Sequence, residues 1–230
     1  MKNPFEFSCD NKRYHTLSYH NKQTFNVKIF KAVIDAGFTC PNKDGSKGIG
    51  GCIFCDGGSG YFTNSYLKSV EEQIKMELKR IKKKNPNARA IAYFQANTNT
   101  YADVQKLKNI YLPVLSQPDV AGISIGTRAD CLQPQILDFL EELSHKTYLT
   151  VELGMQTIHD NTLKLINRGY DHNEFLEGFF SLKKRNIRTC IHIINGLPGE
   201  NIDMMLETAR NIGKLKPDAL KIQLLHVIKN

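Results

Sequence analysis

The chain has 230 residues, which is enough for one sizeable α/β domain but would leave a second complete domain cramped. Hydrophobic residues make up an ordinary 41%, and no apolar run approaches the roughly 20 residues that span a bilayer, so no membrane segment is expected. The formal net charge of +8 suits a polyanionic partner such as RNA, although lysines at solvated helix ends would give the same excess.

The first 26 residues are polar and aromatic, and they are predicted to form an irregular lead-in that packs on the edge of the domain. They contain no apolar run of the kind that defines a signal peptide, which indicates a cytoplasmic protein. Disulfides are rare in that compartment, so the six cysteines are not expected to form a disulfide framework, and the clustered ones are expected to bind metal or do chemistry.

A strand predicted over residues 27–36 leads into a glycine-rich loop with three cysteines in a C-x11-C-x2-C array. These are Cys40, Cys52 and Cys55, and residues 37–60 include eight of the sixteen glycines. Thiolates that converge on one point need a backbone free to adopt positive φ, which glycine allows. The loop is therefore predicted to bind a metal or a cluster.

Helices and strands alternate through the rest of the chain. A helix is predicted over residues 65–84, where Val70, Ile74, Leu78 and Ile81 recur at helical spacing. Further strands are predicted over residues 90–96, 120–126, 148–154, 188–194 and 219–225, and further helices over 102–115 with a break near Pro113, 134–144, 161–166, 173–184 and 201–215. Six such repeats indicate a parallel sheet with right-handed crossovers.

The strand patterns favour a curved sheet over a flat one. Strands that are buried on both faces normally read as continuous apolar runs, whereas four of these strands place polar or small residues on one face. Examples are Gln95 with Asn97, and Glu152 with Gly154 and Gln156. A shared polar face indicates strands that curve around a polar lumen, with helices outside. The predicted fold is an α/β partial (β/α)6 barrel with its site at the C-terminal ends of the strands.

The number of cysteines limits what the loop can bind. A closed structural zinc site takes four ligands, and Cys9, Cys131 or a distant histidine would have to supply the fourth. A [4Fe–4S] cluster held by three thiolates instead leaves one iron open to an outside ligand, whereas simple electron-transfer clusters usually have four cysteines. Zinc and a reactive cluster both stay open on these grounds.

The loop resembles that of the radical S-adenosylmethionine (SAM) superfamily, although the commonest spacing there is C-x3-C-x2-C. Its expanded gap, in GFTCPNKDGSKGIGGCIFC (37–55), resembles a branch related to the catalytic subunit of Elongator, and still more closely a bacterial radical SAM family. The resemblance covers essentially the whole chain, through YFQANTNTYA (93–102), GISIGTRADCL (122–132), VELGMQTIHDNTLKLINRGY (151–170) and HIINGLPGE (192–200).

This resemblance implies a radical SAM core over residues 27–230, preceded by the lead-in 1–26 and without the C-terminal extension of relatives. Cys40, Cys52 and Cys55 would hold three irons of a [4Fe–4S] cluster, and the amino and carboxylate groups of SAM would chelate the fourth. An electron from a donor such as flavodoxin or ferredoxin would cleave SAM to methionine and a 5′-deoxyadenosyl radical that abstracts hydrogen from the substrate.

The resemblance also implies contacts to SAM from the ends of other strands. The glycine-rich motif of relatives is absent at the second strand, so that contact would come from backbone carbonyls or Gln95. An acidic residue of relatives is missing at the third strand, where Arg128 is expected to pair with the SAM carboxylate. The residues expected to contact SAM are Gln95, Asn97, Thr127, Arg128, Gln156, Asn195 and Gly196.

Several other residues are expected to be structural. Cys131 is interpreted as a buried structural cysteine, with thiyl chemistry at the rim as the alternative. Asp160 is a predicted helix N-cap, and His192 is interpreted as a satisfied core histidine. Cys9 and Cys190 are given no function.

The predicted function is a radical SAM enzyme that modifies RNA, with a tRNA wobble uridine as the leading substrate. The prediction depends on the Elongator-related resemblance and on two basic clusters, at residues 68–89 and 183–188. Alternatives are a radical SAM enzyme acting on a small metabolite or a protein, and a non-catalytic cluster- or zinc-binding module. Lys43 and Lys47 leave open a second role of the long loop at the substrate entrance.

Overall fold

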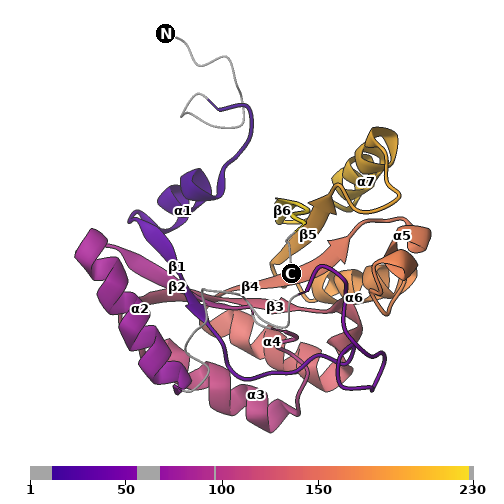
Figure 1. Cartoon of the computed structure of the whole chain (residues 1–230). Helices are drawn as coiled ribbons and strands as arrows, with labels where there is room; N and C mark the ends of the chain where they lie inside the picture. The colour runs from indigo at the N-terminus through magenta and orange to yellow at the C-terminus, as the bar shows by residue number, and fades with distance from the viewer. Residues whose placement is uncertain (1–11, 56–67, 96, 228–230) are drawn as a thin grey trace.

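The computed structural model describes residues 12–55, 68–95 and 97–227. Its centre is a six-stranded sheet in the order β1-β2-β3-β4-β5-β6, so each strand pairs with the next one along the chain (Figure 1). All five pairs are parallel, as predicted. The strands are β1 (Ile29–Ile34), β2 (Arg89–Phe94), β3 (Val120–Thr127), β4 (Tyr148–Gln156), β5 (Thr189–Asn195) and β6 (Ala219–Leu224).

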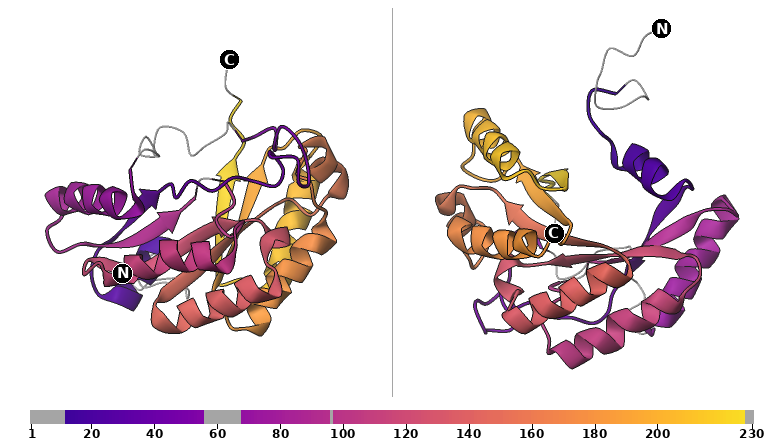
Figure 2. Two further views of the ribbon diagram at one scale, coloured as in Figure 1. Left: turned by 90° about the horizontal axis from the view of Figure 1, so that it is seen from below. Right: turned by 180° about the vertical axis from the view of Figure 1, so that it is seen from behind.

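The sheet is curled into a half-barrel with helices along its outer face (Figure 2). This arrangement confirms the predicted partial barrel. The α-helices are α1 (Leu17–Phe25), α2 (Val70–Lys84), α3 (Val104–Tyr111), α4 (Pro134–Lys146), α5 (Asp160–Leu165), α6 (His172–Lys184) and α7 (Ile202–Leu215), and the 3-10 helices are η2 (Leu112–Ser116) and η3 (Ala129–Cys131). Within the described ranges, no helix is long and apolar enough to cross a bilayer.

Part of the lead-in is helical. Helix α1 begins after Thr16, whose side chain accepts a hydrogen bond from the Tyr19 N–H, and ends at Asn26 with φ of 54°. The Phe25 ring lies 5.0 Å from that of Tyr148 at the start of β4, measured between centroids. The prediction of an irregular lead-in was therefore wrong for this helix, and residues 1–11 of the predicted lead-in lie outside the described residues.

Local sequence signals explain most helix boundaries. Ser69 and Glu72 form a capping box that starts α2, and Pro113 stands where α3 gives way to the 3-10 helix η2. Asp160 was wrongly predicted as an N-cap: His159 holds that position, and the Asp160 carboxylate instead accepts the backbone N–H of His172.

The hydrophobic core fills the space between the sheet and its outer helices. Its largest fully buried side chains include Tyr111, Phe94, Phe139, Phe175 and Phe179. Full burial of such a side chain contributes about 1.5–3 kcal/mol relative to exposure, so this layer dominates the stability of the half-barrel. The inner face of the sheet is left for polar residues.

The helices return antiparallel to the strands, which decides where their basic ends lie. The last turn of α2 contains Lys82, Lys83 and Lys84 and leads directly to the start of β2. The last turn of α6 contains Lys183 and Lys184 and leads to the start of β5. Both basic ends therefore lie beside the N-terminal ends of the strands, opposite the predicted site.

Candidate functional site

A cavity of about 300 Å³ opens at the C-terminal ends of the strands, inside the curl of the sheet. Cys40, Cys52 and Cys55 all line it, together with residues of β2, β3, β4, β5 and β6 and of the adjoining loops. The structure thus brings the three cysteines to the place where the strand pattern put the site. Phe54 lines the same cavity and packs against an apolar cluster.

The eleven residues between Cys40 and Cys52 form a compact folded turn. The Pro41 carbonyl accepts hydrogen bonds from the N–H groups of Lys47 and Gly48, at 2.9 and 3.1 Å. Gly50 and Gly51 both have positive φ, at 82° and 75°, which brings the chain back toward Cys52. The segment between Cys40 and Cys52 is therefore a structured turn and not an irregular linker.

Two lysines attach this turn to the rim of the barrel. Lys43 Nζ donates to Asn97 Oδ1 at 3.0 Å, beyond the end of β2. Lys47 Nζ lies 2.8 Å from Asp130 Oδ2, beyond the end of β3. The lysines that left open a role at the substrate entrance are thus engaged with the barrel itself.

A second attachment joins the turn to the segment after α5. The Asn167 side chain donates to the Gly51 carbonyl at 2.7 Å, and the Ile53 N–H donates to the Ile166 carbonyl at 3.1 Å. The cysteine loop is therefore held between the rim of β2 and β3 on one side and the α5–α6 connection on the other.

Cys52 has two side-chain hydrogen-bond donors. Asn42 Nδ2 lies 3.6 Å from its Sγ, and Arg168 Nη1 lies 3.7 Å from it. Both donor residues are buried, at 0% and 5% relative exposure. Nitrogen donors and positive charge stabilise negative charge on a ligating sulfur, so this environment fits a cysteine that binds a cluster.

Five of the seven residues expected to contact SAM line the cavity: Gln95, Asn97, Thr127, Arg128 and Gln156. Asn195 and Gly196 are not among the described residues that line it. They follow directly after Ile194, which does line it, and the Gly196 N–H donates to Met205 Sδ at 3.3 Å. The structure therefore does not bring these two into the cavity.

Arg128 is held in place by a buried carboxylate. Its Nε and Nη2 atoms donate to the two oxygens of Asp130, each at 2.9 Å, and both side chains are only 3% exposed. Although burial opposes its charge, Asp130 raises the pKa of Arg128 above its ordinary value. Pairing of Arg128 with a SAM carboxylate stays a prediction, and Arg128 would make that contact while bound to Asp130.

Gln156 has the features of a residue placed for a ligand. Its φ is 70°, and the β4–β5 register shifts between Gly154 and Gln156, so a local irregularity aims its side chain. The amide is buried, yet its Oε1 has no hydrogen-bond partner within the described part of the chain. An unpaired buried acceptor in the cavity wall fits a cofactor that offers an amino or hydroxyl donor.

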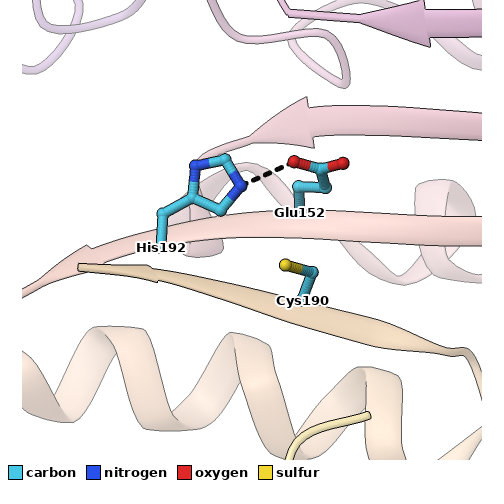
Figure 3. Close-up of side chains that lie close together, drawn as sticks. All are labelled: Glu152, Cys190 and His192. Atoms are coloured by element: carbon cyan, nitrogen blue, oxygen red, sulfur yellow. Dashed lines mark hydrogen bonds and ion pairs between the residues drawn. The ribbon is translucent and has the colours of Figure 1, made fainter. Parts of the chain in front are cut away.

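The floor of the cavity is a charged network centred on Glu152. Its Oε2 accepts from His192 Nε2 at 2.6 Å (Figure 3). Its Oε1 accepts from Lys31 at 2.9 Å and from Ser124 at 2.5 Å. Burial would raise the pKa of Glu152, but the His192 hydrogen bond and the Lys31 charge hold it well below its usual range. Burial lowers the pKa of His192, while the hydrogen bond to Glu152 opposes that shift.

Glu152, Cys190 and His192 offer ligand atoms within 4.8 Å of one another, an arrangement that can hold a metal ion (Figure 3). Their surroundings oppose a cation. Lys31 already pairs with the carboxylate, and Lys221 lies 5.5 Å from the centre of the neighbouring Tyr93 ring. Burial also raises the pKa of Cys190 to about 12, which favours the thiol. We therefore interpret the group as the polar floor of the lumen.

The interpretation of His192 as a satisfied histidine is confirmed by its bond to Glu152, although His192 also lines the cavity. A second cavity of about 650 Å³ lies beneath the floor, lined by Tyr148, Arg188 and residues of α1. Glu152 and Lys221 line both cavities, so the network divides the lumen into an upper and a lower compartment.

Cys131 is 2% exposed, and burial raises its pKa to about 12, which fits the structural interpretation. Asn42 and Arg168 were not predicted as site residues because they lie on loops, whereas the sequence pattern concerned strand ends. The polar Asn167-Arg168-Gly169 triplet directly after a helix was the one available signal.

Comparisons with known proteins agree with this geometry. A family model described as the Radical SAM superfamily matches residues 43–212. A Bacillus subtilis protein named YtqA is 48% identical over 230 residues, which cover all of this chain and 71% of that protein. Over most of its length the chain matches several curated relatives, and it spans 64 to 71% of their lengths.

Two further similarities are more distant. A Methanocaldococcus infernus protein named tRNA uridine(34) acetyltransferase is 30% identical over 105 residues, which cover 44% of this chain and 19% of that protein. The solved structure of archaeal Elp3 from Methanocaldococcus infernus, with an N-terminal deletion, has a TM-score of 0.63 at 18% identity. It aligns with 88% of this chain over 47% of its own length and shows a shared fold.

Proposed function

Since the chain belongs to the radical SAM superfamily, we propose that it is an enzyme that modifies RNA, with the wobble uridine of tRNA as its leading substrate. Its cofactors are a [4Fe–4S] cluster and S-adenosylmethionine. The observation that carries the proposed substrate is the 30% identity over 105 residues with a tRNA uridine(34) acetyltransferase.

The described residues suggest a division of labour in this chemistry. Cys40, Cys52 and Cys55 would hold the cluster at the mouth of the upper cavity. When bound, the two cofactors supply a carbon-centred radical that abstracts hydrogen from the substrate. Gln156 offers its unpaired amide oxygen as an acceptor for SAM, and the Glu152–His192 pair closes the cavity from below.

The charge distribution gives the RNA proposal weaker support than the local sequence similarity does. The basic ends of α2 and α6 lie opposite the cavity mouth, and several of their members are paired internally: Lys82 with Asp119, and Arg185 with Asp138. An RNA that contacted these ends would have to pass along the outside of the half-barrel.

The position of these basic helix ends, away from the cavity mouth, favours a second candidate. This candidate is a radical SAM enzyme that acts on a small metabolite or a protein. A cavity of about 300 Å³ is at the lower end of the volumes that hold small ligands.

For either candidate we place the enzyme in the cytoplasm, where an electron donor such as flavodoxin or ferredoxin would reduce the cluster. Support for that compartment comes from the five described cysteines, which are all free thiols.

The deciding experiment is a nucleoside profile of tRNA from cells that lack this protein. The proposal predicts that one modified uridine falls, or its precursor accumulates, and that the wild-type gene restores it while a Cys52→Ala gene does not. An unchanged profile would contradict the RNA substrate and favour the metabolite or protein.

A separate measurement tests the cofactor chemistry. Anaerobic reconstitution with iron and sulfide is expected to give a broad absorbance near 400 nm and reductive cleavage of SAM. Stoichiometric zinc without cleavage would instead identify a non-catalytic module.

A further inference from the structure

Arg168 has a buried positive charge without a carboxylate beside it. The residue is 5% exposed, and its guanidinium donates to the Gly154 carbonyl at 2.8 Å, to the Tyr170 hydroxyl and to Cys52 Sγ at 3.7 Å. Among the residues that the structure describes, no carboxylate lies within 4.0 Å of it, although Arg128, which is equally buried, has Asp130. A buried charge of this kind needs a counter-ion.

The neighbouring charges do not supply that counter-ion. The guanidinium groups of Arg128 and Arg168 lie 4.7 and 4.2 Å from the centre of the same Tyr170 ring. Asp130, the carboxylate in this group, already pairs with Arg128 and with Lys47. The surroundings of Cys52 are therefore electropositive before anything is bound to its sulfur.

Asn42 supplies a second, independent donor to the same sulfur. Its amide is completely buried and is fixed by a 2.6 Å hydrogen bond from Nδ2 to the Asn167 carbonyl, while the same nitrogen lies 3.6 Å from Cys52 Sγ. In the described part of the chain, neither Cys40 nor Cys55 has a side-chain N–H donor on its sulfur. The three cysteines are thus unequal, and Cys52 is the one with the donors.

We propose that Arg168 and Asn42 set the reduction potential of the iron–sulfur cluster through their hydrogen bonds to Cys52. Donors and positive charge at a ligating sulfur stabilise the reduced, more negative cluster and so raise its potential. Both are positioning residues that act through Cys52, and Arg168 contributes the larger effect because it carries a full charge. The inference rests on the proposed cluster site and adds which residues tune it.

The test is a potentiometric titration of the reconstituted chain, without SAM, followed by electron paramagnetic resonance of the reduced cluster. Arg168→Gln is expected to lower the midpoint by 59 mV or more, so that the ratio of reduced to oxidised cluster at a fixed potential falls at least tenfold. Arg168→Lys keeps the charge, so its midpoint should fall less than that of Arg168→Gln. The midpoint of Asn42→Ala should also fall less than that of Arg168→Gln. Arg185→Gln, at the C-cap of α6, is the control and should leave the midpoint unchanged.

Iron content keeps the possible outcomes apart. A wild-type chain that binds no cluster would contradict the proposed function itself. Variants with wild-type iron and an unchanged midpoint would overturn the tuning inference and leave the proposed function intact. If Arg168→Gln loses iron while Arg168→Lys and Asn42→Ala keep it, the midpoint potentials of the latter two variants test the inference. Loss of iron in all three would overturn the inference in favour of a purely structural role.

Discussion

The side chain of Asn42 and the backbone of Gly169 lie in such close contact that only a glycine fits. A β-carbon at position 169 would come within 2.4 Å of Asn42 Oδ1, and Gly169 has a φ of 75°. Asn42 in turn donates to Asn167 and to Cys52. This contact therefore links the cysteine loop to the connection between α5 and α6.

Gly169→Ala is predicted to destabilise the fold and to reduce iron loading. The left-handed backbone alone costs an alanine about 1–2 kcal/mol, and the clash with Asn42 adds to it. Gly213→Ala in α7 is the matched control, because a β-carbon there meets nothing within 4 Å and is expected to stabilise the helix by about 0.5–1 kcal/mol. Thermal unfolding measures the stability of both variants, and iron analysis measures their loading. Equal melting temperatures and equal iron contents in the two variants would contradict the prediction.

Substitution of each loop cysteine is predicted to remove the cluster. Cys40→Ala, Cys52→Ala and Cys55→Ala should each lose SAM cleavage, because three thiolates hold three irons. Cys131→Ala is the control, since that thiol is buried and structural. Iron and sulfide content and the yield of cleaved SAM are the measurements. Full iron in any loop variant would show that its cysteine is not a ligand.

Lys43→Ala and Lys47→Ala are predicted to leave the cluster intact. The Lys47–Asp130 pair has a lysine side chain that is 37% exposed, so its contribution is expected to stay below about 1 kcal/mol. Asp130 also keeps its bonds to Arg128. Iron content should match that of Lys79→Ala, an exposed position on α2. Iron loss specific to the loop lysines would mean that the turn depends on these attachments.

Stability is predicted to fall as the pH drops below about 6.5, the ordinary pKa of histidine. Burial lowers the pKa of His192 in the folded chain, so the unfolded chain takes up the proton more readily and the stabilisation present above that pH is lost. The slope from one such group cannot exceed about 1.4 kcal/mol per pH unit.

His192→Gln should flatten this dependence while it keeps a donor to Glu152. It should not abolish the dependence, because the pKa values of His20 and His172 are also lowered, mainly by burial. Melting temperatures of the two proteins between pH 5.5 and 7.5 measure the difference, and parallel curves would rule out a contribution from His192.

Most of the half-barrel could be predicted from the sequence, because strand and helix periods are local properties. The polar face that includes Glu152 and Gln156 indicated a lumen, and both residues line it. Helix α1 was missed because its residues are polar and carry no apolar stripe; none of them is fully buried. Its one local signal, the Thr16 cap, is common in turns as well.

The contacts within the site were less predictable, since they join residues that are distant in sequence. Asn42 lies ten residues before Cys52, and Arg168 lies 116 residues after it. Nothing in the local pattern around Arg168 says which sulfur it approaches. That follows only from the curl of the sheet, which brings the α5–α6 connection over the cysteine loop.

Each strand pairs with the one that precedes it in the chain, whereas the cysteine loop joins partners as far as 125 residues away. The sheet can therefore form strand by strand during synthesis, whereas the cysteine loop can fold only after its partners beyond α5 have been made. Asn42 can form its hydrogen bond to the Asn167 carbonyl only after Asn167 has left the ribosome. The cysteine loop is therefore expected to reach its final fold only after β4 and α5 have been made.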